Sequence, residues 1–143
     1  MLSLKFIFVY ICVLALTIAS RTPAEIRQWI LSQAIDCNKE YPVTTEDVQM
    51  MMNMKVPDTT NSKCYISCVL KNINWLNENG DYDLDKAKQF AGNEYSTNAT
   101  VMENAKKLFE TCKSVNDEPV TDGKNGCERA YLLSKCLIEN SPK

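Results

Sequence analysis

The sequence predicts an all-α domain, a compact bundle of about six helices cross-linked by three disulfides. Apolar residues recur at every third or fourth position in several segments, whereas the alternation typical of strands is almost absent. Six cysteines follow an apolar N-terminal segment of the kind that directs secretion. An even set of cysteines in a small secreted chain indicates a disulfide framework.

The N-terminal segment predicts export from the cell. A basic residue precedes an apolar run at residues 6–18, and small residues follow it. This run is shorter than the roughly 20 residues that a membrane-spanning helix needs, and it has the plan of a signal peptide. We expect cleavage near residues 19–20, a signal peptide at 1–20, a single helical domain at 21–143, and a secreted, extracellular product.

The first helix has a clear start signal. Thr22 can cap it, Pro23 suits its first turn, and Glu25 completes a capping box. Pro42 ends the region because proline cannot continue a helix. Thr44 then caps a short second helix, which runs into a stretch rich in methionine.

Four further helices follow, separated by turn residues. Asn79-Gly80 ends the third helix, Gly92 ends the fourth, and a polar loop with Pro119 precedes the last. We expect these helices at residues 61–77, 83–91, from Ser96 or Thr97 to Cys112, and 127–140.

The cysteine spacing restricts the disulfide pairing without settling it. Cys64 and Cys68 are one helical turn apart, so their Cβ atoms lie about 5–6 Å from each other, too far for a disulfide. Cys127 and Cys136 are about 13 Å apart along one helix. Pairings that avoid these two combinations remain open. The six cysteines are Cys37, Cys64, Cys68, Cys112, Cys127 and Cys136.

Composition excludes several function classes. The chain has no histidine, which removes histidine-based nucleophilic catalysis and imidazole metal sites. Its net charge of −2 gives no reason to expect a nucleic-acid partner. No pair of carboxylates stands out as a general acid and base. We therefore expect a protein that is not an enzyme and holds neither metal nor cofactor.

Two stretches of sequence carry a resemblance to a known family. Lys63-Cys64-Tyr65-Ile66-Ser67-Cys68 and the segment from Cys127 to Leu137 resemble the third and last helices of the insect odorant-binding proteins. The whole cysteine ladder is similar to the six-cysteine form of that pheromone and general odorant-binding family. The resemblance extends over residues 22–138, nearly all of the expected mature chain.

The resemblance implies a fold and a function. It implies interlocked disulfides Cys37–Cys68, Cys64–Cys127 and Cys112–Cys136 around an internal apolar cavity. The function that follows is a secreted carrier, which binds small hydrophobic odorants, pheromones or similar molecules and transports them through aqueous fluid. Its expected partners are such a ligand, a weak homodimer and, indirectly, a sensory membrane receptor.

Apolar and hydroxyl-bearing residues of the predicted helices are the candidates for the cavity wall. Methionines suit a site that must accept several ligand shapes because they are flexible and polarisable. The candidates are Trp29, Ile30, Met51, Met54, Tyr65, Val69, Ile73, Leu76, Phe90, Met102, Leu108, Phe109, Tyr131, Ser134, Leu137 and Ile138.

Alternatives and modifications remain open at this stage. The same fold serves outside olfaction, in saliva, venom, seminal fluid or haemolymph, with a host amine, a lipid or a protein as partner. Acid release of ligand through histidine is not expected, and residues 137–143 are too few to form a long inserted helix; Leu137 and Ile138 are candidates for a short lid. Asn98 begins an Asn-Ala-Thr sequon and is a glycosylation candidate.

Overall fold

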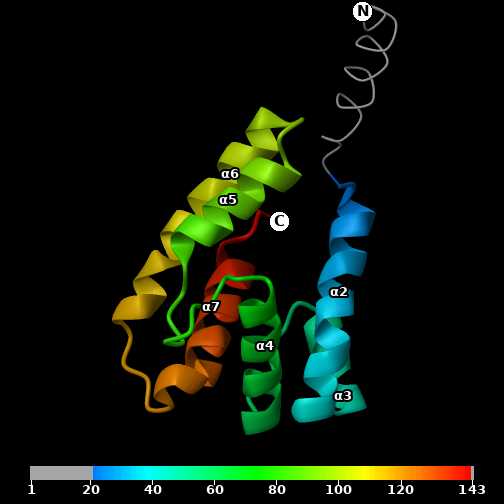
Figure 1. The fold of residues 1–143 in the computed structure, drawn as a ribbon, viewed down its shortest axis with the longest axis vertical. Helices are drawn as coiled ribbons and strands as arrows, with labels where there is room; N and C mark the ends of the chain where they lie inside the picture. The colour runs from blue at the N-terminus through cyan, green and yellow to red at the C-terminus, as the bar shows by residue number, and fades with distance from the viewer. Residues whose placement is uncertain (1–20, 143) are drawn as a thin grey trace, which may run out of the picture.

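The computed structural model describes residues 21–142 (Figure 1). The predicted signal peptide, with Cys12, lies outside the described residues. Within 21–142 the backbone is helical apart from its loops and one isolated antiparallel bridge between Leu76 and Tyr82, so the predicted all-α fold is confirmed. The helices are α2 (Pro23–Glu40), α3 (Thr45–Met52), α4 (Thr60–Asn72), α5 (Leu84–Glu94), α6 (Ala99–Thr111) and α7 (Cys127–Asn140), with short 3₁₀ helices η1 (Cys112–Asp117) and η2 (Gly123–Asn125).

Capping boxes start the first two described helices; the sequence predicts the first box and, at the second helix, Thr44 as the cap residue. The Thr22 hydroxyl accepts a hydrogen bond from the Glu25 amide, and the Glu25 carboxylate accepts one from the Thr22 amide, at 3.3 and 2.6 Å. At α3 the Thr44 hydroxyl and the Asp47 carboxylate exchange the same two bonds. Each box satisfies backbone donors that a helix start leaves unpaired.

The third helix is shorter than predicted. It ends at Asn72 instead of continuing to residue 77, because Asn74 adopts a left-handed backbone with φ 62°. Asparagine tolerates this conformation better than most residues do. The chain then reverses direction in a turn where the Asn77 side-chain oxygen accepts hydrogen bonds from the amides of Asn79 and Asp81. Trp75 and Leu76 therefore lie in a loop where the sequence predicted a helix; Leu76 belongs to the bundle core, and Trp75 packs against it.

The start of α6 also differs slightly from the prediction. Asn98 is the cap residue, and its side-chain oxygen accepts a hydrogen bond of 3.1 Å from the Val101 amide. Ser96 and Thr97, the predicted starts, therefore lie outside the helix. Asn98 is exposed.

The pair of helices α4 and α7 forms the centre of the bundle. α4 packs most extensively on α7, α5 packs on α6, and α2 packs on α4 (Figure 1). The main core lies between α4, the 73–82 loop, α5, α6, η1 and α7. It consists of Leu70, Ile73, Leu76, Tyr82, Ala87, Ala91, Phe109, Cys112, Val115, Ala130 and Leu133. None of the helices within residues 21–142 has the length and apolar character that a membrane crossing requires.

Three disulfides join these helices to one another. Cys37–Cys68 links α2 to α4, Cys64–Cys127 links α4 to α7, and Cys112–Cys136 links the end of α6 to α7. This is the pairing that the family resemblance implies. The bridged residues are 31, 63 and 24 positions apart. Loops of this size give about 3–4 kcal/mol per bridge in the chain-entropy model.

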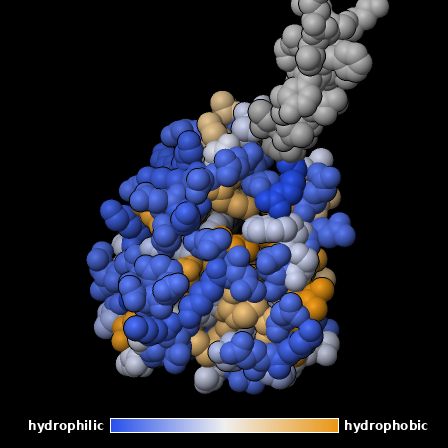
Figure 2. Space-filling view, viewed as in Figure 1, coloured by the Kyte–Doolittle hydropathy of each residue, from blue (hydrophilic) through white to orange (hydrophobic). Residues whose placement is uncertain are grey.

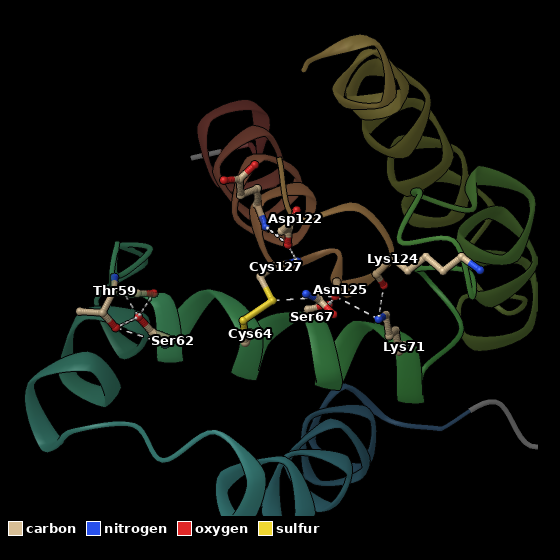
Figure 3. The surroundings of a disulfide bond; sticks show 10 residues. Thr59, Ser62, Cys64, Ser67, Lys71, Asp122, Lys124, Asn125 and Cys127 are labelled. Atoms are coloured by element: carbon tan, nitrogen blue, oxygen red, sulfur yellow. Dashed lines mark hydrogen bonds between the residues drawn. A yellow bond between two sulfur atoms is a disulfide. The ribbon is translucent and has the colours of Figure 1, made fainter. Parts of the chain in front are cut away.

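The loop before α7 is fixed around the central bridge (Figure 3). The Ser67 hydroxyl donates to the Asn125 carbonyl at 2.7 Å, and the Lys71 ammonium donates to the same carbonyl at 3.0 Å. The Asp122 carboxylate accepts from the Cys127 amide at 2.5 Å, so it supplies the cap that Gly126 cannot. These bonds hold the first turn of α7 against α4.

Candidate functional site

Five aromatic side chains from four parts of the chain meet beside the core, and we call them the aromatic cluster. Trp29 of α2 stacks on Phe90 of α5, with ring centroids 6.0 Å apart. Trp75, in the loop after α4, meets Phe90 edge to face at 5.5 Å and Phe109 of α6 at 4.8 Å. Tyr95 meets Phe90 at 6.4 Å. Phe90 is therefore the central ring, and the cluster connects α2 to the core.

Most of the cluster is only partly buried. Phe109 is 6% exposed and belongs to the core, whereas Trp29, Trp75, Phe90 and Tyr95 keep part of their surface accessible. On the face shown in Figure 2, hydrophobic side chains reach the surface along the middle of the molecule, with a mainly hydrophilic surface on the side that carries α5 and α6. Partly buried aromatic rings of this size present apolar surface that a small ligand would cover.

An ion pair joins the segment just before α2 to the end of α5 at the edge of the cluster. The Arg21 guanidinium donates from Nε to both carboxylate oxygens of Glu94 at 3.0 Å, and its Nη2 also donates to Oε1. Glu94 is only 9% exposed, so this partner keeps a nearly buried carboxylate paired. The guanidinium also lies 4.4 Å from the centre of the Trp29 ring. The hydrogen bond to Glu94 raises the pKa of Arg21 above its ordinary value.

Hydroxyl and indole groups supply the polar character near the cluster. Burial raises the pKa of the Tyr95 hydroxyl, and burial followed by the charges of Glu110 and Asp83 raises the pKa of Tyr82 far above the ordinary value of 10.0. The Tyr82 hydroxyl donates to the Phe109 carbonyl at 3.4 Å. The Trp75 indole nitrogen is buried and has no hydrogen-bond partner among residues 21–142.

The predicted cavity residues lie in several different environments. Ile73, Leu76 and Phe109 are core residues, and Trp29, Leu108 and Leu137 pack partly buried against that core. Phe90 is the centre of the aromatic cluster. Leu137 and Ile138 lie within α7, which extends to Asn140, so they form no separate lid. The other candidates that are partly buried are Ile30, Met51, Val69, Met102, Ser134 and Ile138.

Three candidates lie away from the cluster. Met54 is 60% exposed because the chain leaves α3 there in a left-handed conformation, with φ 56°. The prediction that Met54 lines an internal cavity is therefore wrong. The centre of the Tyr131 ring lies 4.6 Å from the Lys63 ammonium and 5.4 Å from the Lys135 ammonium. Tyr65 lines a groove on the outside of the bundle.

This outer groove is a feature that sequence reasoning missed. It lies between α2, α3 and α4 and has a volume of about 670 Å³. Leu31 and Ile35, one turn apart on α2, are 60% and 65% exposed there, and Val48 of α3 is 40% exposed. The four-residue spacing of Leu31 and Ile35 could have revealed the groove from the sequence, since the two residues form a second apolar face of α2. The groove is lined by Gln28, Leu31, Ser32, Ala34, Ile35, Asn38, Val43, Thr44, Thr45, Val48 and Tyr65.

Sequence reasoning also missed Arg21, Trp75, Glu94 and Tyr95. Arg21 and Glu94 are 73 residues apart in the sequence, and only the tertiary fold brings them together. Trp75 joins the site because α4 ends early. No group of three metal-ligating side chains is placed to bind an ion within residues 21–142.

Comparisons with known proteins agree with this architecture. General odorant-binding protein 28a of Drosophila melanogaster is 30% identical over 118 residues, covering 80% of this chain and 76% of the relative. General odorant-binding protein 19d of the same species is 22% identical over 106 residues, covering 74% and 67%.

Solved structures show the same fold. Odorant-binding protein dmelOBP28a of Drosophila melanogaster superposes with a TM-score of 0.62 at 27% identity, covering 80% of this chain and 91% of that one. Odorant binding protein 4 of the predator Chrysopa pallens gives 0.65 at 26% identity, with 82% and 90% covered. The model of the PBP/GOBP family matches residues 19–140, which include all six disulfide-bonded cysteines and every described helix. The chain therefore belongs to the PBP/GOBP family and is an insect odorant-binding protein.

Proposed function

We propose that the chain is a secreted, non-catalytic carrier that binds one small hydrophobic molecule against the aromatic cluster and transports it through extracellular fluid. The observation that supports this most strongly is the partly buried state of Trp29, Trp75, Phe90 and Tyr95 beside a closed core. The disulfides support it too, because covalent links hold α2 on the bundle without requiring a fully packed interior.

The energetics are sufficient for micromolar binding. A ligand of ten to fourteen carbons that buries about 300 Å² gains about 7 kcal/mol from the hydrophobic effect. Loss of translational and rotational freedom opposes this gain, and a hydrogen bond adds to it. We expect a Kd in the low micromolar range, equivalent to about −8 kcal/mol. Specificity among chains of similar length should be broad because apolar burial discriminates weakly.

Displacement of N-phenyl-1-naphthylamine, a fluorescent apolar probe, tests this proposal. The full chain is expressed in insect cells, and the secreted product is oxidised, delipidated and analysed for its N-terminus. We expect saturable one-to-one binding that long-chain esters and ketones reverse. Replacing Phe90 with Ser should weaken binding about tenfold or more, because the central ring touches three others.

Leu31→Ser is the matched control. It also removes an apolar side chain, but from the outer groove, and it should leave probe affinity unchanged. Absence of saturable binding to monodisperse, correctly bridged protein contradicts the carrier function. Loss of binding in Leu31→Ser with retention in Phe90→Ser would place the ligand outside the bundle.

The outer groove favours a second candidate function, in which the fold binds a protein partner. Leu31, Ile35 and Val48 expose apolar surface there that no described part of the chain covers. The simplest such partner is a second copy of the chain in a weak homodimer. Sedimentation equilibrium of the wild type and of Leu31→Ser tests this, since only the wild type should self-associate.

A further inference from the structure

The indole N–H of Trp75 is a buried hydrogen-bond donor without an acceptor in the described structure. Buried donors in native proteins are almost always paired, so an unpaired one calls for an explanation. Trp75 as a residue remains partly accessible, yet its nitrogen is enclosed. The polar edge of the indole therefore faces inward.

The backbone fixes the position of this donor. The Trp75 amide donates to the Leu70 carbonyl at 2.8 Å, and the Trp75 carbonyl accepts from the Asp83 amide at 2.8 Å. Asn74, in its left-handed conformation, turns the chain just before it. The ring itself is held edge to face against Phe90 and Phe109, at interplanar angles of 80° and 68°. A donor held in this way is preorganised for whatever group it meets.

The neighbours of the indole are apolar rings. Phe90 and Phe109 carry no acceptor other than their π systems, which accept hydrogen bonds only weakly. The nearby hydroxyl of Tyr82 donates to a main-chain carbonyl, and the Glu94 carboxylate is paired with Arg21. A carbonyl oxygen on an apolar ligand would satisfy the indole N–H, and a hydrocarbon of the same shape would leave it unpaired.

We propose that the Trp75 indole N–H is the hydrogen-bond donor that selects ligands carrying a carbonyl oxygen, such as ketones, aldehydes and esters, over hydrocarbons of equal shape. This inference rests on the proposed carrier function and names the ligand class of that same site. Apolar burial would supply most of the affinity, and the indole would set the preference for oxygen.

A matched pair of ligands isolates the effect of the oxygen. Undecan-2-one and 2-methylundec-1-ene have nearly the same shape, with oxygen in the first where the second has a methylene group. Their affinities are measured by probe displacement for the secreted wild type and Trp75→Phe. We expect Trp75→Phe to lower the affinity for the ketone three- to tenfold more than that for the alkene, the range for one net hydrogen bond.

Trp29→Phe is the control because Trp29 belongs to the same cluster and carries the same ring. It should change both affinities by the same factor. If Trp75→Phe also changes them equally, the inference is wrong and the carrier function stands. If neither ligand binds the wild type, both the inference and the carrier function fail.

Nuclear magnetic resonance gives a second reading that needs no Trp75 variant. The chain contains two tryptophans, so its proton–nitrogen spectrum has two indole resonances, and Trp29→Phe leaves that of Trp75 alone. Undecan-2-one should move this proton downfield, and the alkene should not. An upfield position that neither ligand changes would show an N–H bonded to a phenyl face and would overturn the inference.

Discussion

Arg129 shows at the scale of one residue how the irregular end of the bundle is held. This side chain of α7 is 4% exposed, and its Nη1 donates to the carbonyls of Val115 and Glu118, the second at 2.8 Å. Both carbonyls belong to the stretch from η1 to the following loop, and the Val115 carbonyl also accepts a hydrogen bond of 3.3 Å from the Glu118 amide. The buried arginine thus adds side-chain donors to carbonyls that lie outside the α-helices.

Removal of this side chain should destabilise the fold. We expect Arg129→Ala to lower the free energy of unfolding by about 2–4 kcal/mol, because it removes the arginine hydrogen bonds to two carbonyls and opens a cavity. Arg27→Ala on the exposed face of α2 is the control and should stay within about 0.5 kcal/mol of the wild type. Urea unfolding of the oxidised proteins measures both. Equal stabilities of the two variants would contradict this role of Arg129.

At the scale of elements, the turn after α4 meets the loop before α7 through two glycines. A Cβ on Gly126 would lie 3.0 Å from the Gly80 Cα and 3.3 Å from the Ser67 hydroxyl oxygen, and its φ is +67°. Gly123 has a similar φ, +53°, with open space around it. Gly92, inside α5, has open space and no unusual φ. Gly126 thus combines steric contact with a left-handed backbone, Gly123 has the left-handed backbone alone, and Gly92 has neither.

Alanine substitutions at these three glycines should therefore change the stability of the protein by different amounts. We expect Gly126→Ala to cost more stability than Gly123→Ala, which should cost about 1–2 kcal/mol for the left-handed backbone alone. Gly92→Ala should stabilise the protein by about 0.5–1 kcal/mol because alanine favours a helix. Thermal unfolding gives the three values. A Gly126→Ala variant as stable as Gly123→Ala would show that the two loops do not touch.

Elements were predictable from sequence where the signals were local. The capping box at Thr22 and the cap at Thr44 are short-range patterns, and the structure confirms both. The end of α4 was not predictable from periodicity, because Ile73 and Leu76 continue a helical spacing while Asn74 breaks the backbone. The candidate site was predictable only in part. Trp29 and Phe90 follow from helix faces, but Arg21, Trp75 and Glu94 join through tertiary packing.

At the scale of the whole molecule, the charges suggest stability to mild acid. Hydrogen bonds from Thr22 and Thr121 lower the pKa values of Glu25 and Glu128 below their ordinary 4.5. A hydrogen bond from Lys88 lowers the pKa of Glu110 in the same way. The unfolded chain therefore binds more protons than the folded one below about pH 4.5, so acid favours unfolding only there.

The midpoint of thermal unfolding should consequently stay nearly constant from about pH 7 to pH 5.5 and fall below about pH 4.5. Ligand affinity should also stay nearly constant over the upper range, since the chain has no histidine. Glu128→Gln should weaken the dependence of the midpoint on pH in the acid range. A steep loss of affinity between pH 7 and pH 5.5 would contradict this account.

The central claim concerns the whole molecule, namely that one apolar ligand lies against the aromatic cluster between α2 and the core. A crystal structure of the secreted product with bound undecan-2-one tests it most directly. The account predicts the alkyl chain in contact with Trp29 and Phe90, and the carbonyl oxygen within about 3 Å of the Trp75 indole nitrogen. A ligand found instead in the outer groove, or a solid aromatic cluster with no bound ligand at saturating concentration, would contradict it.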